Sequence, residues 1–200
     1  GFLSMLARKF GAKRCFCIEQ NPDMAKLLKE LLKANGVKNC TIIEAHSTEV
    51  SNLPKADLVI SETLGNFAYE EGIIETMRDA RRFLKEGGVT IPSSIAQYAA
   101  PVTAERLWKE FAGSWNDIGF DLVWEPALRR TMNNCYVKRG ETDELLTGSS
   151  WDTVDFRTKK NVSIRTGSLE WKIKEPQMIF GLLLWFECTL APGIVLSTSP

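Results

Sequence analysis

Residues 57–71 have the sequence DLVISETLGNFAYEE, and this stretch decides the predicted fold. The apolar run at 57–60 predicts a buried strand, and apolar residues at helical spacing over 71–84 predict a helix after it. The loop between them contains Gly65 and carries two carboxylates, Glu62 and Glu71, nine positions apart. It therefore lies at a strand-to-helix switch, where α/β sheets bind ligands. Two acids brought together there require a cation.

Upstream of this loop, helical and strand patterns alternate. Helices are expected over 1–10 and from Asn21-Pro22 to about Asn35, and short buried strands over 15–19 and 40–44. Parallel strands need helical crossovers. The order of elements therefore predicts a doubly wound, Rossmann-like α/β domain over residues 1–92.

Downstream of residue 92 the pattern changes to short alternating runs with turn residues between them. Antiparallel strands are expected at 97–102, 135–137, 162–164, 169–173 and 178–186. They predict a second domain of sandwich or barrel type over 93–200. Residues 103–128 interrupt it with a helical segment at 105–111 and a cluster of Trp115, Phe120 and Trp124. Spacing alone does not decide whether these aromatic residues pack on their own domain or contact a partner.

The composition excludes several classes of protein. With 25 basic and 25 acidic side chains, the chain has no global attraction to nucleic acid or anionic lipid. Its longest apolar run, 178–186, is far shorter than the roughly 20 residues of a spanning helix. The odd number of cysteines favours reduced thiols in a cytoplasmic protein, and the Cys15-Phe16-Cys17 spacing does not favour a metal site. We therefore expect no direct nucleic-acid binding, no membrane association and no metal.

Candidate nucleoside-binding residues follow the first two predicted strands. Glu19 ends the strand 15–19, where an acid is placed to accept hydrogen bonds from the two hydroxyls of a ribose; the alternative is an exposed strand-end carboxylate. Ser47 and Thr48 lie in the next loop, which would border the base or be simply solvated. The glycine-rich turn of such a site is represented only by Gly1, as its last residue. A hydrolase would have to use the single histidine, His46, and no Gly-x-Ser-x-Gly motif is present.

These residues resemble a known family. Ser61-Glu62, Gly65 and Glu71 resemble the double-glutamate loop of the protein arginine methyltransferases. Further segments match in the same order: 1–5 resembles the helix after the cofactor glycine loop, 18–19 the ribose-binding acid, 83–92 the join to the β-barrel, 115–121 part of the dimerisation arm, and 181–186 a barrel strand. The sequence at 65–68 is more similar to divergent members of the family, including prokaryotic-looking ones and the symmetric-dimethylating branch, than to the commonest eukaryotic type. That type also has Trp in place of Thr63.

The resemblance implies a fold, a cofactor and an activity. The fold is a Rossmann-like methyltransferase domain followed by an antiparallel β-barrel domain with a helical dimerisation arm at about 103–128. The cofactor is S-adenosyl-L-methionine, and the binding residues are Gly1, Glu19, Ser47, Thr48 and Glu62. The substrate is an arginine-containing protein, and the assembly is a homodimer. The family's first strand and glycine loop would precede Gly1, and its Thr-His-Trp loop would follow Pro200. Its adenine-side acid is here Thr48, with Glu49 or Glu44 as alternatives. We expect a polypeptide with these limits to bind cofactor poorly or not at all.

The chemistry of the loop agrees with this implication. The guanidinium of arginine stays protonated up to a pKa above about 12, so it is a poor nucleophile until its charge is drawn away from one terminal nitrogen. Glu62 and Glu71 are the candidate catalytic residues because two carboxylates can pair with the guanidinium fork and do this. We expect Glu70 to face solvent or to cap the following helix. Two alternatives remain: a methyltransferase for a small molecule or a ribosomal protein, and a non-catalytic oligomerisation partner.

Overall fold

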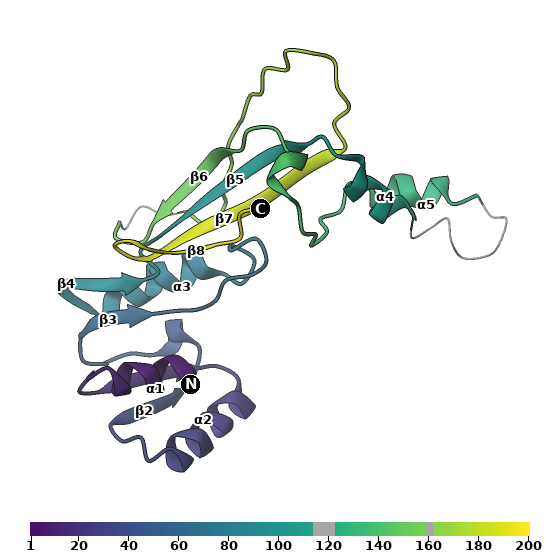
Figure 1. Ribbon diagram of the computed structural model, residues 1–200. Coiled ribbons are helices and arrows are strands. Elements are labelled where there is room, and N and C mark those ends of the chain that lie inside the picture. The colour runs from purple at the N-terminus through teal and green to yellow at the C-terminus, as the bar shows by residue number, and fades with distance from the viewer. Residues whose placement is uncertain (114–122, 159–161) are drawn as a thin grey trace. The chain divides into compact units, whose positions relative to one another are not determined.

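A computed structural model describes residues 1–113, 123–158 and 162–200 (Figure 1). The chain divides into two compact units. One comprises residues 1–62 and 74–91, and the other comprises residues 63–73 and 92–200. The loop 63–73, which follows Glu62, thus belongs to the second unit although the strand before it belongs to the first.

The first unit alternates helices and parallel strands. In chain order its elements are α1 (Phe2–Lys9), β1 (Cys15–Glu19), α2 (Pro22–Ala34), β2 (Cys40–Glu44), η1 (Ser47–Glu49), β3 (Ala56–Ile60), α3 (Ile73–Ala80), η2 (Arg81–Phe83) and β4 (Leu84–Ile91). β1 pairs with β2 and β3 with β4, both in parallel. The α/β alternation and the parallel pairing predicted from the sequence are confirmed.

Helix α2 shows why these residues fold locally as they do. The side chain of Asn21 accepts hydrogen bonds from the backbone N–H groups of Asp23 and Met24, at 2.9 and 3.2 Å. Pro22 follows in the first turn, where its missing N–H costs no hydrogen bond. The apolar stripe of the helix is buried and packs near Cys17 of β1 through Leu28 and Leu32. The cap and the stripe together fix both the start of α2 and the face it turns to the strands.

The helix expected over 71–84 is shorter in the structure. Gly72 has a φ of 73°, which ends the preceding loop, and α3 begins only at Ile73. A 3-10 turn then leads directly into β4, because Leu84 already pairs with Ala56 of β3. Strand pairing therefore replaces the last helical turn that the apolar spacing predicted.

The second unit is built on an antiparallel sheet. Its strands are β5 (Ser94–Val102), β6 (Ser149–Asp155), β7 (Gly181–Ala191) and β8 (Ile194–Ser197), in the spatial order β6-β5-β7-β8 (Figure 1). The helices α4 (Glu105–Gly113) and α5 (Glu125–Thr131) and the 3-10 turn η3 (Thr142–Glu144) lie between β5 and β6 in the chain. The antiparallel sheet is confirmed. Over the described residues it is open, with β6 and β8 at its edges, so closure into a barrel stays a prediction.

Several expected strands are absent from the described part of this unit. No strand forms at 135–137, 162–164 or 169–173. Tyr136 packs its ring on Phe111 of α4, with centroids 4.8 Å apart, and Trp171 donates a hydrogen bond to the carbonyl of Thr147. Contacts of single side chains with neighbouring segments, and not strand pairing, thus hold the runs at 135–137 and 169–173.

The expected helix at 105–111 is confirmed as α4, and Trp124 precedes α5. Trp115, Phe120 and the segment 115–121 lie outside the described residues. None of the helices in the described ranges is long and apolar enough to cross a membrane.

Candidate active site

The loop 63–73 in the second unit has a closed backbone conformation. The N–H of Ala68 donates to the carbonyl of Gly65, that of Tyr69 to Phe67, and that of Gly72 to Tyr69, at 3.0, 2.8 and 3.2 Å. Ala68 is completely buried and has a φ of 62°, a left-handed conformation that is uncommon for alanine. Such a conformation persists only when surrounding contacts hold it.

Those contacts come from the sheet of the same unit. Gln97 of β5 is completely buried and donates through Nε2 to the carbonyl oxygen of Phe67 at 2.7 Å. The ring of Phe67 stacks on Trp151 of β6, with centroids 6.3 Å apart and planes within 11°. The hydroxyl of Tyr69 donates to Oδ2 of Asp152 at 3.0 Å. Two neighbouring strands therefore hold the loop at two of its residues.

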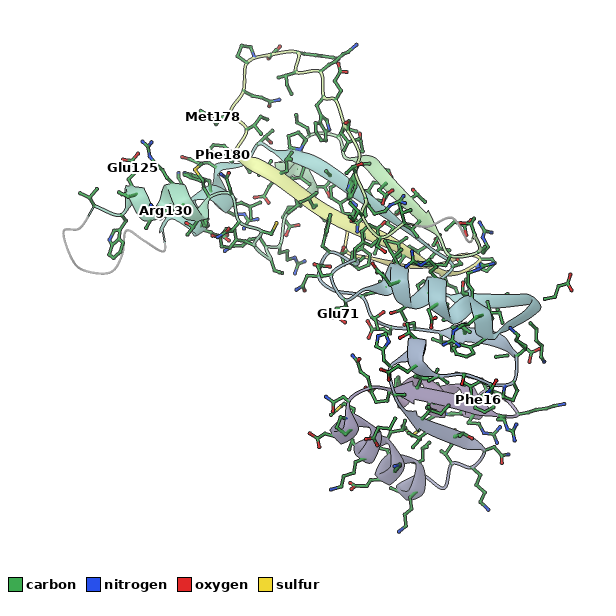
Figure 2. The ribbon with its side chains drawn as sticks, turned by 180° about the vertical axis from the view of Figure 1, so that it is seen from behind. Phe16, Glu71, Glu125, Arg130, Met178 and Phe180 are labelled. Atoms are coloured by element: carbon green, nitrogen blue, oxygen red, sulfur yellow. The ribbon has the colours of Figure 1, made fainter. Side chains whose placement is uncertain are left out.

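Glu71 follows this anchored segment. Its side chain is exposed on the loop that precedes α3, where Figure 2 labels it. In the part of the chain that the structure describes, its carboxylate makes no hydrogen bond and no ion pair. It is available to a cationic ligand.

Glu70 has a role within the loop. Its Oε1 accepts a hydrogen bond from the N–H of Phe67 at 2.6 Å. The side chain is exposed, as expected, and it also turns back on its own loop. It helps to close the loop.

Glu62 belongs to the first unit. It lies two residues beyond β3 and is exposed, and the N–H of Ser61 before it donates to the carbonyl of Ile91 at 3.0 Å. This bond extends the pairing of β3 and β4 up to the residue before Glu62. Because Glu62 and Glu71 lie in different units, each is placed within its own unit only, and their joint action on one ligand stays a prediction.

The first unit brings together the predicted nucleoside-binding residues around the ends of β1 and β2. Glu19 and Glu44 are register partners, and the N–H of Ala45 donates to the carbonyl of Glu19. Oε1 of Glu19 accepts from the N–H of Asn21 at 2.8 Å. Its other carboxylate oxygen makes no hydrogen bond with a described residue. Glu19 is thus held in orientation with one oxygen available, which fits a ribose hydroxyl.

Ser47 and Thr48 lie in the 3-10 turn that follows β2. His46 caps the turn, with Nδ1 2.7 Å from Oγ1 of Thr48, and Glu49 closes a capping box with His46. Arg82 binds the turn from η2, because its guanidinium donates to the carbonyls of Ser47 and Val50, both at 2.5 Å. The sequence did not indicate this role of Arg82, since more than 30 residues separate it from these carbonyls.

Gly1 lies directly before α1 and close to α2. A Cβ at this position would lie 2.2 Å from Cδ1 of Leu28. The absence of a side chain therefore permits the close approach of the two segments. The cofactor-binding role expected for Gly1 stays a prediction.

Comparison with known proteins agrees with this architecture. A family model described as "Methyltransferase domain" matches residues 1–88. The chain is 29% identical over 214 residues to a histone-arginine methyltransferase CARMER of Anopheles gambiae, covering 100% of this chain and 34% of that protein. It is also 29% identical over 174 residues to protein arginine N-methyltransferase 1 of Oryza sativa subsp. indica, covering 78% and 45%.

Solved structures give the same result for the fold. The chain superposes on the Trypanosoma brucei PRMT1 enzyme-prozyme heterotetrameric complex with AdoHcy at a TM-score of 0.79, with 21% identity over 100% of this chain and 65% of that one. It superposes on Arabidopsis thaliana protein arginine methyltransferase 10 at a TM-score of 0.75, with 23% identity over 100% and 67%. The chain is similar in sequence to arginine methyltransferases over its whole length and shares the fold of the two solved structures. The predicted fold class is confirmed, and the chain spans less than half the length of the two curated arginine methyltransferases that it matches.

Proposed function

We propose that the protein transfers a methyl group from S-adenosyl-L-methionine to a guanidino nitrogen of arginine in a protein substrate. The observation that carries this proposal is the loop from Glu62 to Glu71, with two exposed carboxylates and a backbone closed by its own hydrogen bonds. Similarity to proteins named arginine methyltransferases supports it.

In this proposal the two carboxylates act on the substrate. Glu62 and Glu71 bind the guanidinium by charge-assisted hydrogen bonds and draw its positive charge toward the nitrogens they contact. The remaining terminal nitrogen gains electron density and attacks the methyl carbon as the bond from that carbon to sulfur breaks. The proton lost from this nitrogen passes to solvent or to one of the two carboxylates. Alignment and fixed charge supply the acceleration.

The residues of the first unit fit the cofactor. When bound, S-adenosyl-L-methionine supplies an electrophilic methyl group on a sulfonium. Glu19 would hold the ribose through its available oxygen, while Ser47 and Thr48 would border the adenine on a turn that Arg82 keeps in place. Gly1 and Glu62 complete the set that we propose for the cofactor.

Substitution of each glutamate tests the reaction. In the full-length protein, Glu62→Gln and Glu71→Gln should each abolish methyl transfer to an arginine-rich peptide, because the amide cannot balance the guanidinium charge. Calorimetric titration should show nearly unchanged binding of S-adenosyl-L-methionine by Glu71→Gln, because Glu71 is not among the residues proposed to hold the cofactor. Glu75→Gln, an exposed glutamate of α3, is the matched control and should keep full activity.

Two other results would replace this proposal. Full activity in both glutamine variants, or methylation of another substrate but not of arginine peptides, would point to a methyltransferase of different specificity. Failure of the full-length protein to bind S-adenosyl-L-methionine would point to a non-catalytic partner.

We also propose that the protein acts as a cytoplasmic homodimer. Its free cysteines support a reducing compartment. The similar structure from T. brucei is a heterotetrameric complex, which supports oligomeric assembly. We assign that assembly to the region 103–128 from its resemblance to the dimerisation arm. Light scattering of the full-length protein, with and without this region, measures the contribution of the region to assembly.

A further inference from the structure

Asp152 lies at the centre of a polar network in the second unit. Its side chain is only 7% exposed on β6 and forms an ion pair with Arg165, whose own side chain is 21% exposed. Nε of Arg165 donates to Oδ2 at 2.8 Å, Nη2 donates to Oδ1, and Nη2 also reaches the carbonyl of Thr153 at 3.2 Å. The guanidinium fork thus holds the Asp152 carboxylate in one orientation.

The same carboxylate accepts the hydroxyl hydrogen of Tyr69. Burial acts to raise the pKa of Asp152, but the hydrogen bonds from Arg165 and Tyr69 outweigh it and lower the pKa. Burial and the nearby Asp152 charge raise the pKa of Tyr69. Near neutral pH, Asp152 is therefore an acceptor only and Tyr69 is the donor, so the hydrogen bond has a single direction.

A second contact fixes the loop from the neighbouring strand. Gln97 and Asp152 are register partners across β5 and β6. Gln97 holds the carbonyl of Phe67, and Asp152 holds the side chain of Tyr69. The loop is therefore attached at two points, and the second point lies only two residues before Glu71.

We propose that Tyr69, Asp152 and Arg165 are positioning residues for Glu71, the carboxylate that would bind the substrate guanidinium. Since the Glu71 carboxylate makes no hydrogen bond or ion pair with the described residues, the loop backbone is what places the origin of this side chain. Release of Tyr69 frees that backbone and misplaces the carboxylate. This inference rests on the proposed function, which gives Glu71 its role in catalysis.

The test removes a single hydroxyl. Tyr69→Phe in the full-length protein should lower kcat by about 10-fold to 100-fold, because misplacement by about an ångström costs that much in alignment. The KM for S-adenosyl-L-methionine should stay unchanged. Tyr98→Phe is the matched control, because Tyr98 donates to Oε2 of Glu187 at 3.1 Å on the same sheet but does not hold the loop. A merely structural role would change the melting temperature but leave kcat per folded molecule unchanged.

A second variant addresses the ion pair. Asp152→Asn should lower kcat in the same direction, and Tyr69→Phe in the Asp152→Asn background should cost less than Tyr69→Phe alone, because the neutral amide oxygen is a weaker acceptor for the Tyr69 hydroxyl. Asp155→Asn is its control, since Asp155 on the same strand pairs with the exposed Arg157. Equal loss of kcat in Asp155→Asn or Tyr98→Phe, or full additivity of the two test substitutions, would overturn the inference.

Hydrogen exchange separates this inference from the proposed function. The amides of Ala68, Tyr69 and Gly72, which are bonded within the loop, should exchange faster in Tyr69→Phe, whereas those of β7 should not change. Unchanged loop exchange overturns the positioning role even if the protein is active. Faster loop exchange in a protein inactive toward arginine supports the anchor and contradicts the proposed reaction.

Discussion

The side chain of Glu70 occupies the space that a Cβ would need at Gly65. A Cβ built there would lie 2.6 Å from Oε2, 2.9 Å from Cδ and 3.0 Å from Cβ of Glu70. At the same time Oε1 of Glu70 accepts the N–H of Phe67. Gly65 is therefore needed because the Glu70 side chain closes the loop over it, and not because of its backbone conformation, which is not left-handed.

Gly65→Ala should break this arrangement. The added methyl displaces the Glu70 carboxylate and removes its bond to Phe67, so we expect the free energy of unfolding to fall by about 1 to 2 kcal/mol. Urea unfolding of the full-length protein measures this change. The double variant Gly65→Ala, Glu70→Ala should lose less stability than the sum of the two single variants, since the clashes with Oε2 and Cδ are then absent and only the 3.0 Å approach to Cβ remains. Two fully additive losses would show that Glu70 and Gly65 do not interact.

Much of the first unit was predictable because its elements are set by local sequence. β1 and β2 were expected over 15–19 and 40–44 and have those bounds, and the cap at Asn21 marked the start of α2. The alternation of apolar residues did not predict the structure correctly where the pairing of distant strands determines it. The run at 169–173 alternates like a strand but has no partner strand among the described residues, whereas β6 pairs with β5 although its sequence SSWDTVD is largely polar.

In the candidate site, too, some residues could be predicted from the sequence and others could not. Glu62 and Glu71 could be named from spacing, because one loop carries both of them. The residues that hold the loop before Glu71 could not be named from the sequence, because Tyr69 and Asp152 are 83 residues apart and Phe67 and Gln97 are 30 apart. A buried glutamine in a strand is a weak signal, and only the tertiary fold shows what it binds.

Arg82→Ala should weaken cofactor binding without touching the cofactor. Its guanidinium donates to the carbonyls of Ser47 and Val50 and pairs with Asp79. Loss of these bonds should loosen the turn at 47–49 and raise the Kd for S-adenosyl-L-methionine about 10-fold, equivalent to about 1.4 kcal/mol. Calorimetric titration measures the Kd. Arg78→Ala, at an exposed arginine of α3, is the control, and an equal effect in both variants would contradict a specific role for Arg82.

The ion pair of Asp152 with Arg165 predicts a defined pH dependence of stability. The pKa of Asp152 in the folded state lies below the value of about 3.9 for an unfolded chain. The pair therefore stabilises the fold fully above that unfolded value, and its contribution is lost as the pH falls through the lower, folded pKa. At pH 7, Asp152→Asn should cost about 3 kcal/mol, because it leaves the mostly buried Arg165 without its charge partner. Urea unfolding at pH 7, 5 and 3 measures the difference in free energy of unfolding between wild type and Asp152→Asn. This difference should stay constant from pH 7 to pH 5 and become smaller by pH 3. As the control, Asp155→Asn, at a more exposed pair, should cost less than about 1 kcal/mol at pH 7. A gap that stays constant down to pH 3 would show that the charge on Asp152 does not stabilise the fold.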